Sequence, residues 1–306
     1  MASIQDYDKP AAPAPKRDLP VPKFSDIDLD TLQVKFADPK SSKSVACFFS
    51  IKHPKTGDRV PFIYRTPKMS LPFGVSDYVN DKTGNVSWSI TATFDGEDPS
   101  NENDTIHKYR TFLENVTNRF YTLFYPKAND WLVKGAGKKK KGNISEEEFR
   151  DMVLGMIREN DDSKYSDFVR ETIANERVKE ADGKISYTNN MDADLRIAKY
   201  DYNTKSTIPT TPSTFKDESK RCKAYRCVHL VGTKINPSRN VLSFYTKVKQ
   251  ILYYEAPPVD EYMESFNNFK LAVSDDEDED GGYGHPDEVP SKEESEGEQE
   301  EEVLED

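Results

Sequence analysis

The most regular pattern of hydrophobic and polar residues lies at the end of the stretch 65–94. From position 86 every second residue is apolar, with serine or threonine between; the apolar residues are Val86, Trp88, Ile90, Ala92 and Phe94. This period of two is typical of a strand with one buried face. Residues 80–85 are rich in Asn, Asp and Gly, which favour turns, so residues 74–79 should fold back as the other arm of a hairpin. We predict a sheet over residues 60–94.

Shorter apolar runs predict further strands on both sides of this sheet. Residues 45–51 and 60–64 are joined by a turn that contains Pro and Gly, and Pro61 should weaken the second strand or place it at an edge, because proline has no N–H to donate. Residues 203–219 are rich in Thr, Ser and Pro, which predicts a loop. The remaining predicted strands are 168–173, 184–187, 195–200, 224–231 and 241–254, and a turn at 181–183 should join the first two.

Two segments change to the period of a helix. Between residues 106 and 123 apolar residues recur every three or four positions, which predicts an amphipathic helix that ends near Pro126. A second helix should begin after Ser145, whose spacing to Glu148 is that of a capping box, and its apolar stripe continues to Ile157. The chain is therefore expected to be α+β and mainly β.

The net charge of −12 combines two different parts of the chain. From Ser274 to Asp306 there are 17 acidic residues and one basic residue, Lys292, which gives a net charge of −16. Residues 1–273 carry 42 Lys and Arg against 38 Asp and Glu, a net charge of +4. A basic body with an acidic tail is typical of proteins that bind nucleic acid or are regulated by the tail. An acidic run that only keeps the protein in solution is the alternative.

Composition also predicts how the chain is divided. Residues 1–23 are rich in Pro and Ala and should form a disordered arm. Residues 24–258 should form one domain with a helical insertion at about 105–158. Residues 259–306 are expected to be a linker and a disordered acidic tail.

The strand predicted at 241–254 carries the main candidate chemistry. Its alternation separates an apolar face from a face on which cations and aromatic rings alternate, namely Tyr245, Lys247, Lys249 and Tyr253. Binding of single-stranded nucleic acid needs this mixture, because cations neutralise phosphates while unstacked bases lie on aromatic rings. An ordinary solvated strand face can have the same composition, so both interpretations stay open.

A second basic segment lies before and inside the preceding predicted strand. It contributes Lys220, Arg221, Lys223, Tyr225 and Arg226. If the two strands pair, their basic edges form one groove. A glycine-flanked loop could extend that groove along phosphates, or could be a flexible solubilising loop; its cations are Lys138, Lys139, Lys140 and Lys141.

The sequence lacks the motifs that mark several other classes of protein. The four histidines and three cysteines have no spacing of metal ligands, so no structural zinc is expected. No nucleotide-binding or hydrolase motif is present, so we expect neither enzymatic activity nor a cofactor. Few cysteines and no apolar signal or spanning stretch predict an intracellular, reducing location and no membrane.

Two motifs carry a resemblance to a known family: Leu71-Pro72-Phe73-Gly74-Val75-Ser76 before a hairpin, and FYTKVKQI at 244–251 in the last strand. Over about residues 45–254 the chain resembles the single-stranded DNA-binding proteins of nucleocytoplasmic large DNA viruses. The resemblance implies an OB-fold barrel with helical insertions, acting in viral DNA replication, recombination or repair in the host cytoplasm or nucleus, with the virion as a further location. One departure is that the family usually has an aromatic residue, often Trp, in the penultimate strand, where this chain has Tyr225 and His229.

Barrel and acidic tail together also resemble the layout of podophage-type single-stranded DNA-binding proteins, whose tails contact replication proteins. We therefore expect a non-catalytic protein whose partner is single-stranded DNA and whose tail gates binding or recruits replication partners. The alternative is a virion or scaffold protein whose sheet and tail serve protein contacts.

Overall fold

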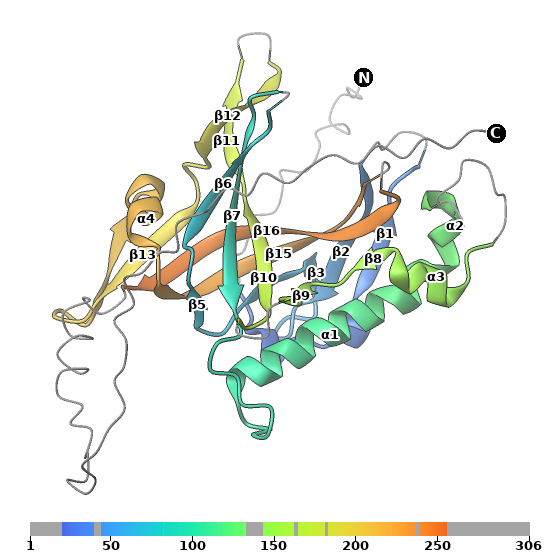
Figure 1. The fold of residues 1–306 in the computed structure, drawn as a ribbon, viewed down its shortest axis with the longest axis horizontal. Coiled ribbons are helices and arrows are strands. Elements are labelled where there is room, and N and C mark those ends of the chain that lie inside the picture. The colour runs from blue at the N-terminus through green and yellow to red at the C-terminus, as the bar shows by residue number, and fades with distance from the viewer. Residues whose placement is uncertain are drawn as a thin grey trace, which may run out of the picture. The chain divides into compact units, whose positions relative to one another are not determined.

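Five strands form a closed barrel at the centre of the structure. The computed structural model describes residues 20–39, 44–81, 83–132, 143–161, 165–180, 183–236 and 239–255. The barrel strands are β5 (Met69–Leu71), β7 (Val86–Thr93), β10 (Phe168–Ile173), β15 (Cys222–Asn236) and β16 (Val241–Tyr254). They follow one another in the order β5-β7-β10-β16-β15, and β15 pairs with β5 to close the ring (Figure 1).

Neighbouring strands in this ring are antiparallel, except for the parallel pair β10 and β16. A five-stranded barrel with such Greek-key connections is OB-like. In chain order its first three strands are β5, β7 and β10, and its last two are β15 and β16. The predicted fold class, α+β and mainly β with an OB-like barrel, is confirmed, while the predicted disordered tail lies outside the described residues.

The sheet continues past the barrel because β15 and β16 are longer than their barrel partners. Beyond its pairing with β5, the edge of β15 that faces away from β16 also pairs with β4 and β2. The edge of β16 that faces away from β15 pairs with β13 and β8 as well as with β10. These outer strands are β1 (Gln33–Phe36), β2 (Val45–Lys52), β3 (Arg59–Pro61), β4 (Ile63–Arg65), β6 (Val75–Val79), β8 (Val153–Leu154), β9 (Ile157–Arg158), β13 (Arg196–Asp201) and β14 (Ser206–Thr210). A separate two-stranded sheet consists of β11 (Asn175–Lys179) and β12 (Ile185–Met191).

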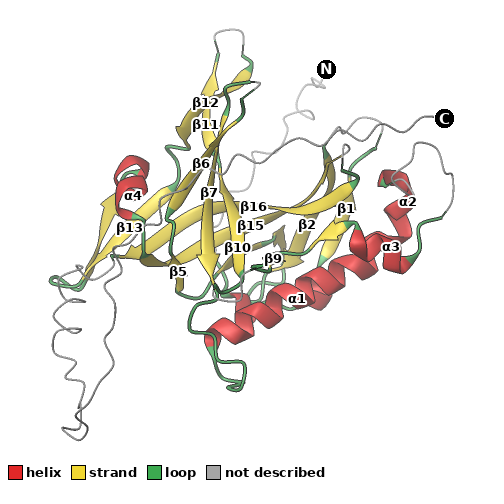
Figure 2. Ribbon diagram, viewed as in Figure 1, coloured by secondary structure: helices red, strands yellow, loops and turns green. Residues whose placement is uncertain are grey.

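One long helix and several short ones complete the fold (Figure 2). They are α1 (Thr105–Phe124), α2 (Ala128–Trp131), α3 (Glu146–Asp151), α4 (Pro212–Glu218) and the 3₁₀ turns Phe24–Asp26, Leu29–Thr31 and Tyr125–Lys127. Helix α1 is capped by Asp104, whose side chain accepts a 2.6 Å hydrogen bond from the His107 N–H. It runs along one side of the barrel, opposite the projecting β6–β7 and β11–β12 hairpins (Figure 1).

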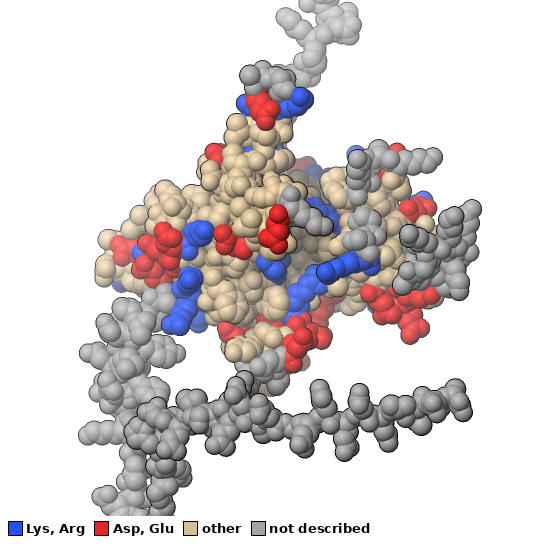
Figure 3. All heavy atoms as spheres, turned by 45° about the horizontal axis from the view of Figure 1, so that its top comes forward, with Lys and Arg blue, Asp and Glu red and all other residues tan. Residues whose placement is uncertain are grey.

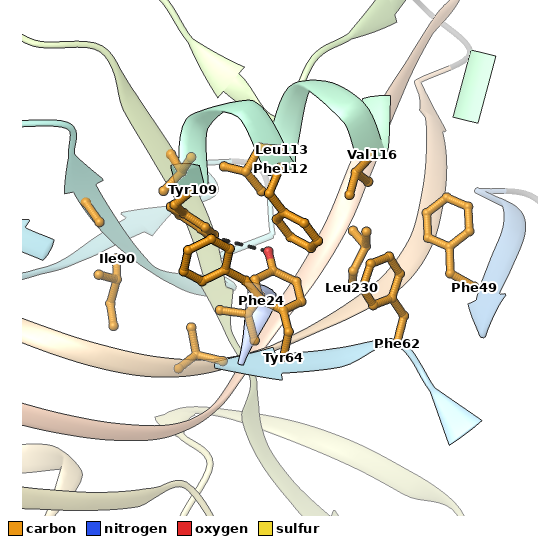
Figure 4. Packing of buried hydrophobic residues seen from close by; sticks show 14 of the residues in the cluster. Phe24, Phe49, Phe62, Tyr64, Ile90, Tyr109, Phe112, Leu113, Val116 and Leu230 are labelled. Atoms are coloured by element: carbon orange, nitrogen blue, oxygen red, sulfur yellow. Dashed lines mark hydrogen bonds between the residues drawn. The ribbon is translucent and has the colours of Figure 1, made fainter. Parts of the chain in front are cut away.

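The core is an aromatic layer between α1 and the sheet. The apolar stripe of α1 places Tyr109 and Phe112 against rings from β4 and the N-terminal segment (Figure 4), and Phe120 against Phe49 and Phe244. Tyr109 lies edge-on to Phe24, with ring centroids 5.1 Å apart, and its hydroxyl is 3.4 Å from that of Tyr64. Such rings contribute large buried area, so this layer fixes the helix on the barrel.

Several predicted elements differ from the observed ones. The second helix ends at Asp151, because the apolar residues that continue its stripe, Val153 and Ile157, enter strands that pair with β16 and β10. The predicted loop 203–219 contains β14 and α4. Strand β12 pairs with β11, a strand absent from the prediction, rather than with β10, and residues 181 and 182 of the predicted turn lie outside the described residues. The secondary structure of these segments depends on the strands with which they pair, and their local composition does not reveal those partners.

A β-bulge in β16 changes which residues face outward. Cys227 pairs with Gln250 and Val228 pairs with Val248, so Lys249 is an extra residue in β16. A bulge of this kind shifts the alternation by one position. The predicted separation of faces therefore holds up to the bulge and is wrong beyond it, where Tyr253 turns inward and Tyr254 outward.

A buried ion pair crosses the barrel interior between β10 and β15, which are not neighbours in the ring. The Arg226 Nε donates to Glu171 Oε2 at 2.6 Å and Nη2 donates to Oε1 at 3.2 Å. Both side chains are almost fully buried. Burial lowers the pKa of Arg226, but the charge and hydrogen bonds of Glu171 outweigh it, and the net shift is upward.

We expect Arg226→Met to lower the free energy of unfolding by about 3–5 kcal/mol, because it leaves the Glu171 carboxylate buried without a partner. The double variant Glu171→Leu/Arg226→Met should recover most of that loss, since it removes both charges. Urea unfolding followed by tryptophan fluorescence measures both. Arg65→Met, at an exposed position, is the control, and a double variant no more stable than the single one would contradict the expectation.

Candidate nucleic-acid interface

A cleft of about 430 Å³ opens where the β11–β12 hairpin meets the barrel. Its walls come from the start of β7, the end of β10, strand β12 and the outer face of β16. Asn175 and Asn189 hold these walls together: Asn175 Nδ2 donates to the carbonyls of Val86 and Thr188, both at 2.8 Å, and the Asn189 carbonyl accepts from Trp88 Nε1 at 3.0 Å. The cleft is thus a preformed feature between a hairpin and the barrel.

Tyr245 lies in this cleft beside two cations. Lys234 Nζ is 3.4 Å and Lys247 Nζ is 5.3 Å from the centre of its ring. Tyr187, which also lines the cleft, is 66% exposed. Cation–π contacts hold the ammonium groups beside the ring, so the cleft presents aromatic faces and positive charge together.

The cations of this face are available to a ligand. Within the described part of the chain, no carboxylate forms an ion pair with Lys223, Lys234, Lys247 or Lys249. By contrast, Lys199 pairs with Glu218 and Glu255. One view of the surface shows Lys and Arg side chains in a broken band, with acidic side chains on either side (Figure 3).

The structure brings several predicted residues to one face. Tyr245 and Lys247 line the cleft, and Lys249 is exposed at the bulge. Lys223 and Tyr225 lie on the outer face of β15, opposite Tyr254 and Leu252. They are at the far end of the β15–β16 ladder from the cleft. That these residues bind nucleic acid stays a prediction.

Two predicted site residues are wrongly placed by the sequence pattern. Arg226 points into the barrel and pairs with Glu171, because β15 alternates and its outward positions here are those of Lys223 and Tyr225. Tyr253 is buried by the shift at the bulge, its ring centroid is 4.9 Å from that of Phe215, and its hydroxyl donates to Glu218 at 2.6 Å. Neither side chain can reach a bound strand in this arrangement.

The other predicted cations lie apart from the cleft. Lys220 and Arg221 are exposed in the segment before β15, and the Arg221 N–H donates to the Leu71 carbonyl at 3.0 Å. This places them at the turn that contains the Leu71–Gly74 part of the sequence motif. Lys138, Lys139, Lys140 and Lys141 lie outside the described residues.

Sequence reasoning missed the groups that complete this face. Tyr187, Asn175 and Lys234 enter through strand pairings that no local pattern reveals. Lys234 could have been found by extending the predicted strand 224–231 along its partner, because it pairs with Ser243, two residues before Tyr245. Among the described residues, no group of three or more His, Cys, Asp or Glu is placed to hold a metal ion, and no helix is long and apolar enough to cross a membrane.

The pKa of His229 reflects its burial and the positive charge of this face. It pairs with Lys247 across the β15–β16 ladder. Burial, followed by the charges of Lys249 and Lys247, lowers its pKa to about 4. The imidazole is therefore neutral at physiological pH, in the field of two ammonium groups that have no carboxylate partner within the described residues.

We expect this depressed pKa to cost stability in acid. Between pH 6.5 and about 4 the unfolded chain takes up a proton at this histidine that the folded chain does not, so stability falls as the pH is lowered through this range. His229→Gln should lose less stability than the wild type over the same range. Thermal melts at stepped pH measure this, and parallel curves for the two proteins would show that His229 is not the group responsible.

Comparison with known proteins gives distant likenesses. No family model and no curated protein matches the sequence. Among solved structures, the chain is similar to gp2.5, a single-stranded DNA-binding protein encoded by bacteriophage T7, with a TM-score of 0.39 and 10% identity over 74% of this chain and 100% of that chain. It is also similar to the single-stranded DNA-binding protein from bacteriophage Enc34 in complex with single-stranded DNA, with a TM-score of 0.34 and 10% identity over 74% and 97% of the two chains. Because both TM-scores are below 0.5, we infer function from the surface of this chain alone.

Proposed function

We propose that the chain binds single-stranded DNA, without catalysis, in the cleft between the β11–β12 hairpin and the barrel. One observation carries the proposal: the ring of Tyr245 lies beside the ammonium groups of Lys234 and Lys247, which form no ion pair within the described residues, and shares a cleft with the exposed Tyr187. Bases can stack on such rings while the adjacent cations neutralise phosphates.

The position of the cleft on the barrel supports the same function. OB-folds bind oligonucleotides on the face of their second and third strands, near the loop between the first and second strands. Here those strands are β7 and β10, and the connection between the first two barrel strands contains β6, which pairs with β7 in a hairpin whose turn end, at Asn85 and Val86, lines the cleft. This is a fold-level analogy, and the side chains of the cleft carry the specific part of the proposal.

The same chemistry favours a single strand over a duplex. In a duplex the faces of the bases stack on one another, so Tyr245 and Tyr187 would gain no stacking partner. Single-stranded bases offer their faces freely, and stacking on an aromatic side chain contributes about 1–3 kcal/mol per base.

We further propose that the acidic tail regulates binding. Its net charge of −16 is tethered to a body of net charge +4, so tail carboxylates can compete with phosphates at high effective concentration. Recruitment of replication proteins by the tail, and a role in viral replication, recombination or repair inside the host cell, follow from the sequence resemblance and belong to the same proposal.

A protein-contact function is the second candidate, and the projecting hairpins favour it. Val79, Val178 and Ile185 are apolar side chains on these hairpins, with exposed fractions of 50%, 41% and 60%. Exposed apolar side chains that lie near one another are typical of interaction sites. Absence of any single-strand binding would leave this function as the better candidate.

Tyr245→Ala and Lys247→Ala should weaken binding in different ways. Loss of the ring removes stacking and should cost about 1–3 kcal/mol with an unchanged salt dependence. Loss of the ammonium should also reduce the slope of log K against log salt by about 0.7, since one phosphate contact is lost. Fluorescence anisotropy with a labelled single strand at several salt concentrations measures both, with a blunt duplex for comparison.

Tyr165→Ala and Lys52→Ala are matched controls, because both residues are exposed and lie away from the cleft. They should bind like the wild type. Wild-type affinity that is equal for duplex and single strand, or unchanged in both cleft variants, would overturn the proposed function.

Removal of residues 275–306 should raise the affinity for single-stranded DNA. The deletion removes 17 acidic residues and one lysine and changes the net charge from −12 to +4. Because charges are screened beyond about 10 Å at 0.1 M salt, the difference between full-length and truncated protein should shrink as salt increases. Equal affinities at every salt concentration would show that the tail does not compete for the site.

A further inference from the structure

Four tyrosine rings gather on the outer face of the sheet at the end away from the cleft. We call Tyr200, Tyr202, Tyr225 and Tyr254 the tyrosine cluster. The Tyr254 ring lies at its centre, with centroid distances of 4.9 Å to Tyr200, 6.1 Å to Tyr202 and 6.1 Å to Tyr225. The rings come from β13, the turn after it, β15 and β16.

Two cations accompany these rings. Lys68 Nζ lies 3.8 Å from the centre of the Tyr254 ring, and Lys223 pairs with Tyr254 across the β15–β16 ladder. Burial, then the charge of Lys223, lowers the pKa of Lys68. In the described part of the chain neither lysine has a carboxylate partner, while Glu218 and Glu255 at the same end of the sheet both pair with Lys199. Two ammonium groups that repel each other beside aromatic rings suit an anionic ligand with flat, unsaturated groups.

The tyrosine cluster and the cleft lie on the same outer face. Along β16, Lys247 and Tyr254 both point outward, because the bulge between them changes the phase. They are about 20 Å apart at the usual rise of a strand. Two exposed guanidinium groups stand between them, since one row of paired residues runs Arg65, Cys227, Gln250, Arg196 across four strands. A positive, partly aromatic track therefore connects the two ends.

Resting on the proposed function, we infer that the tyrosine cluster is a second contact site for the same single strand, which leaves the cleft, crosses the row of arginines and stacks bases on Tyr202 and Tyr254. At the 3.4 Å spacing of stacked nucleotides, about 20 Å corresponds to about six nucleotides. That length is within the range of about 4–16 nucleotides for one OB-fold.

A purely structural role for the tyrosine cluster does not account for the exposed ring of Tyr202. Tyr225 and Tyr254 are partly covered and pack on each other, as core-flanking rings do. Tyr202, however, is 61% exposed and holds its edge against the cluster from a turn. A ring so exposed buries little area, so it contributes little to the fold and remains free to stack on a base.

The test compares binding of full-length wild type, Tyr202→Ala and Tyr202→Phe to (dT)4 and (dT)12. A (dT)4 strand can occupy the cleft alone, whereas (dT)12 can reach both sites. We expect Tyr202→Ala to bind (dT)12 about 5- to 150-fold more weakly than the wild type and (dT)4 within twofold, because one stacked base is lost only on the longer strand. Tyr202→Phe should bind both strands like the wild type, since it keeps the ring.

Tyr165→Ala is the matched control, because Tyr165 is 63% exposed and lies elsewhere on the surface. Wild-type binding of (dT)12 by Tyr202→Ala, with Tyr245→Ala still defective, would overturn the second site and leave the proposed function intact. An equal loss on (dT)4 and (dT)12 would also overturn the arrangement of two contacts. A wild-type protein that binds neither strand would overturn the proposed function and this inference together.

Discussion

The pairing of β15 with β16 is the constraint on which the described structure depends. The two strands form one long antiparallel ladder, and each uses its other edge for further strands: β5, β4 and β2 along β15, and β10, β13 and β8 along β16. To change partners along its length, β15 must approach β2 closely at Gly232. A Cβ there would lie 1.8 Å from the Cys47 carbonyl oxygen, so only glycine fits. The barrel and its extensions meet at this hairpin.

The same hairpin explains why charge is treated differently on its two faces. Inside the barrel, Arg226 is held by a bidentate contact to Glu171 and is isolated from solvent. Outside, Lys223 and Lys247 have no carboxylate partner within the described residues and stand beside tyrosine rings. A buried charge needs a counter-ion because its desolvation costs free energy. An exposed charge stays hydrated without a partner and remains accessible to a ligand.

Local periodicity was sufficient to predict most strands and the long helix. Alternation over 86–94 and the three-to-four spacing over 106–123 correspond to β7 and α1, because each element buries one continuous face. The second helix was predicted too long, since Val153 pairs with Leu242 in a strand whose partner lies far away in sequence. Pairing partners of this kind leave no local signal.

The candidate site was less predictable than the fold. Tyr245 and Lys247 could be found because they precede the bulge, whereas one inserted residue at Lys249 moved Tyr253 into the core. No feature of the local pattern marks that insertion. The phase of β15 was also open from sequence: a period of two places Lys223 and Arg226 on opposite faces but does not say which of them faces inward.

The β11–β12 hairpin forms its own two-stranded sheet, and hydrogen bonds of Asn175 and Asn189 are among its attachments to β7. Hairpins attached in this way can open locally at a lower free energy than global unfolding, while the barrel behind them stays folded. One wall of the cleft therefore belongs to a sheet of its own, held to the barrel partly by two asparagine side chains. Substitutions at these asparagines would change the wall of the cleft, whereas substitutions in the barrel core would change the stability of the fold, so the two properties can be adjusted by different residues.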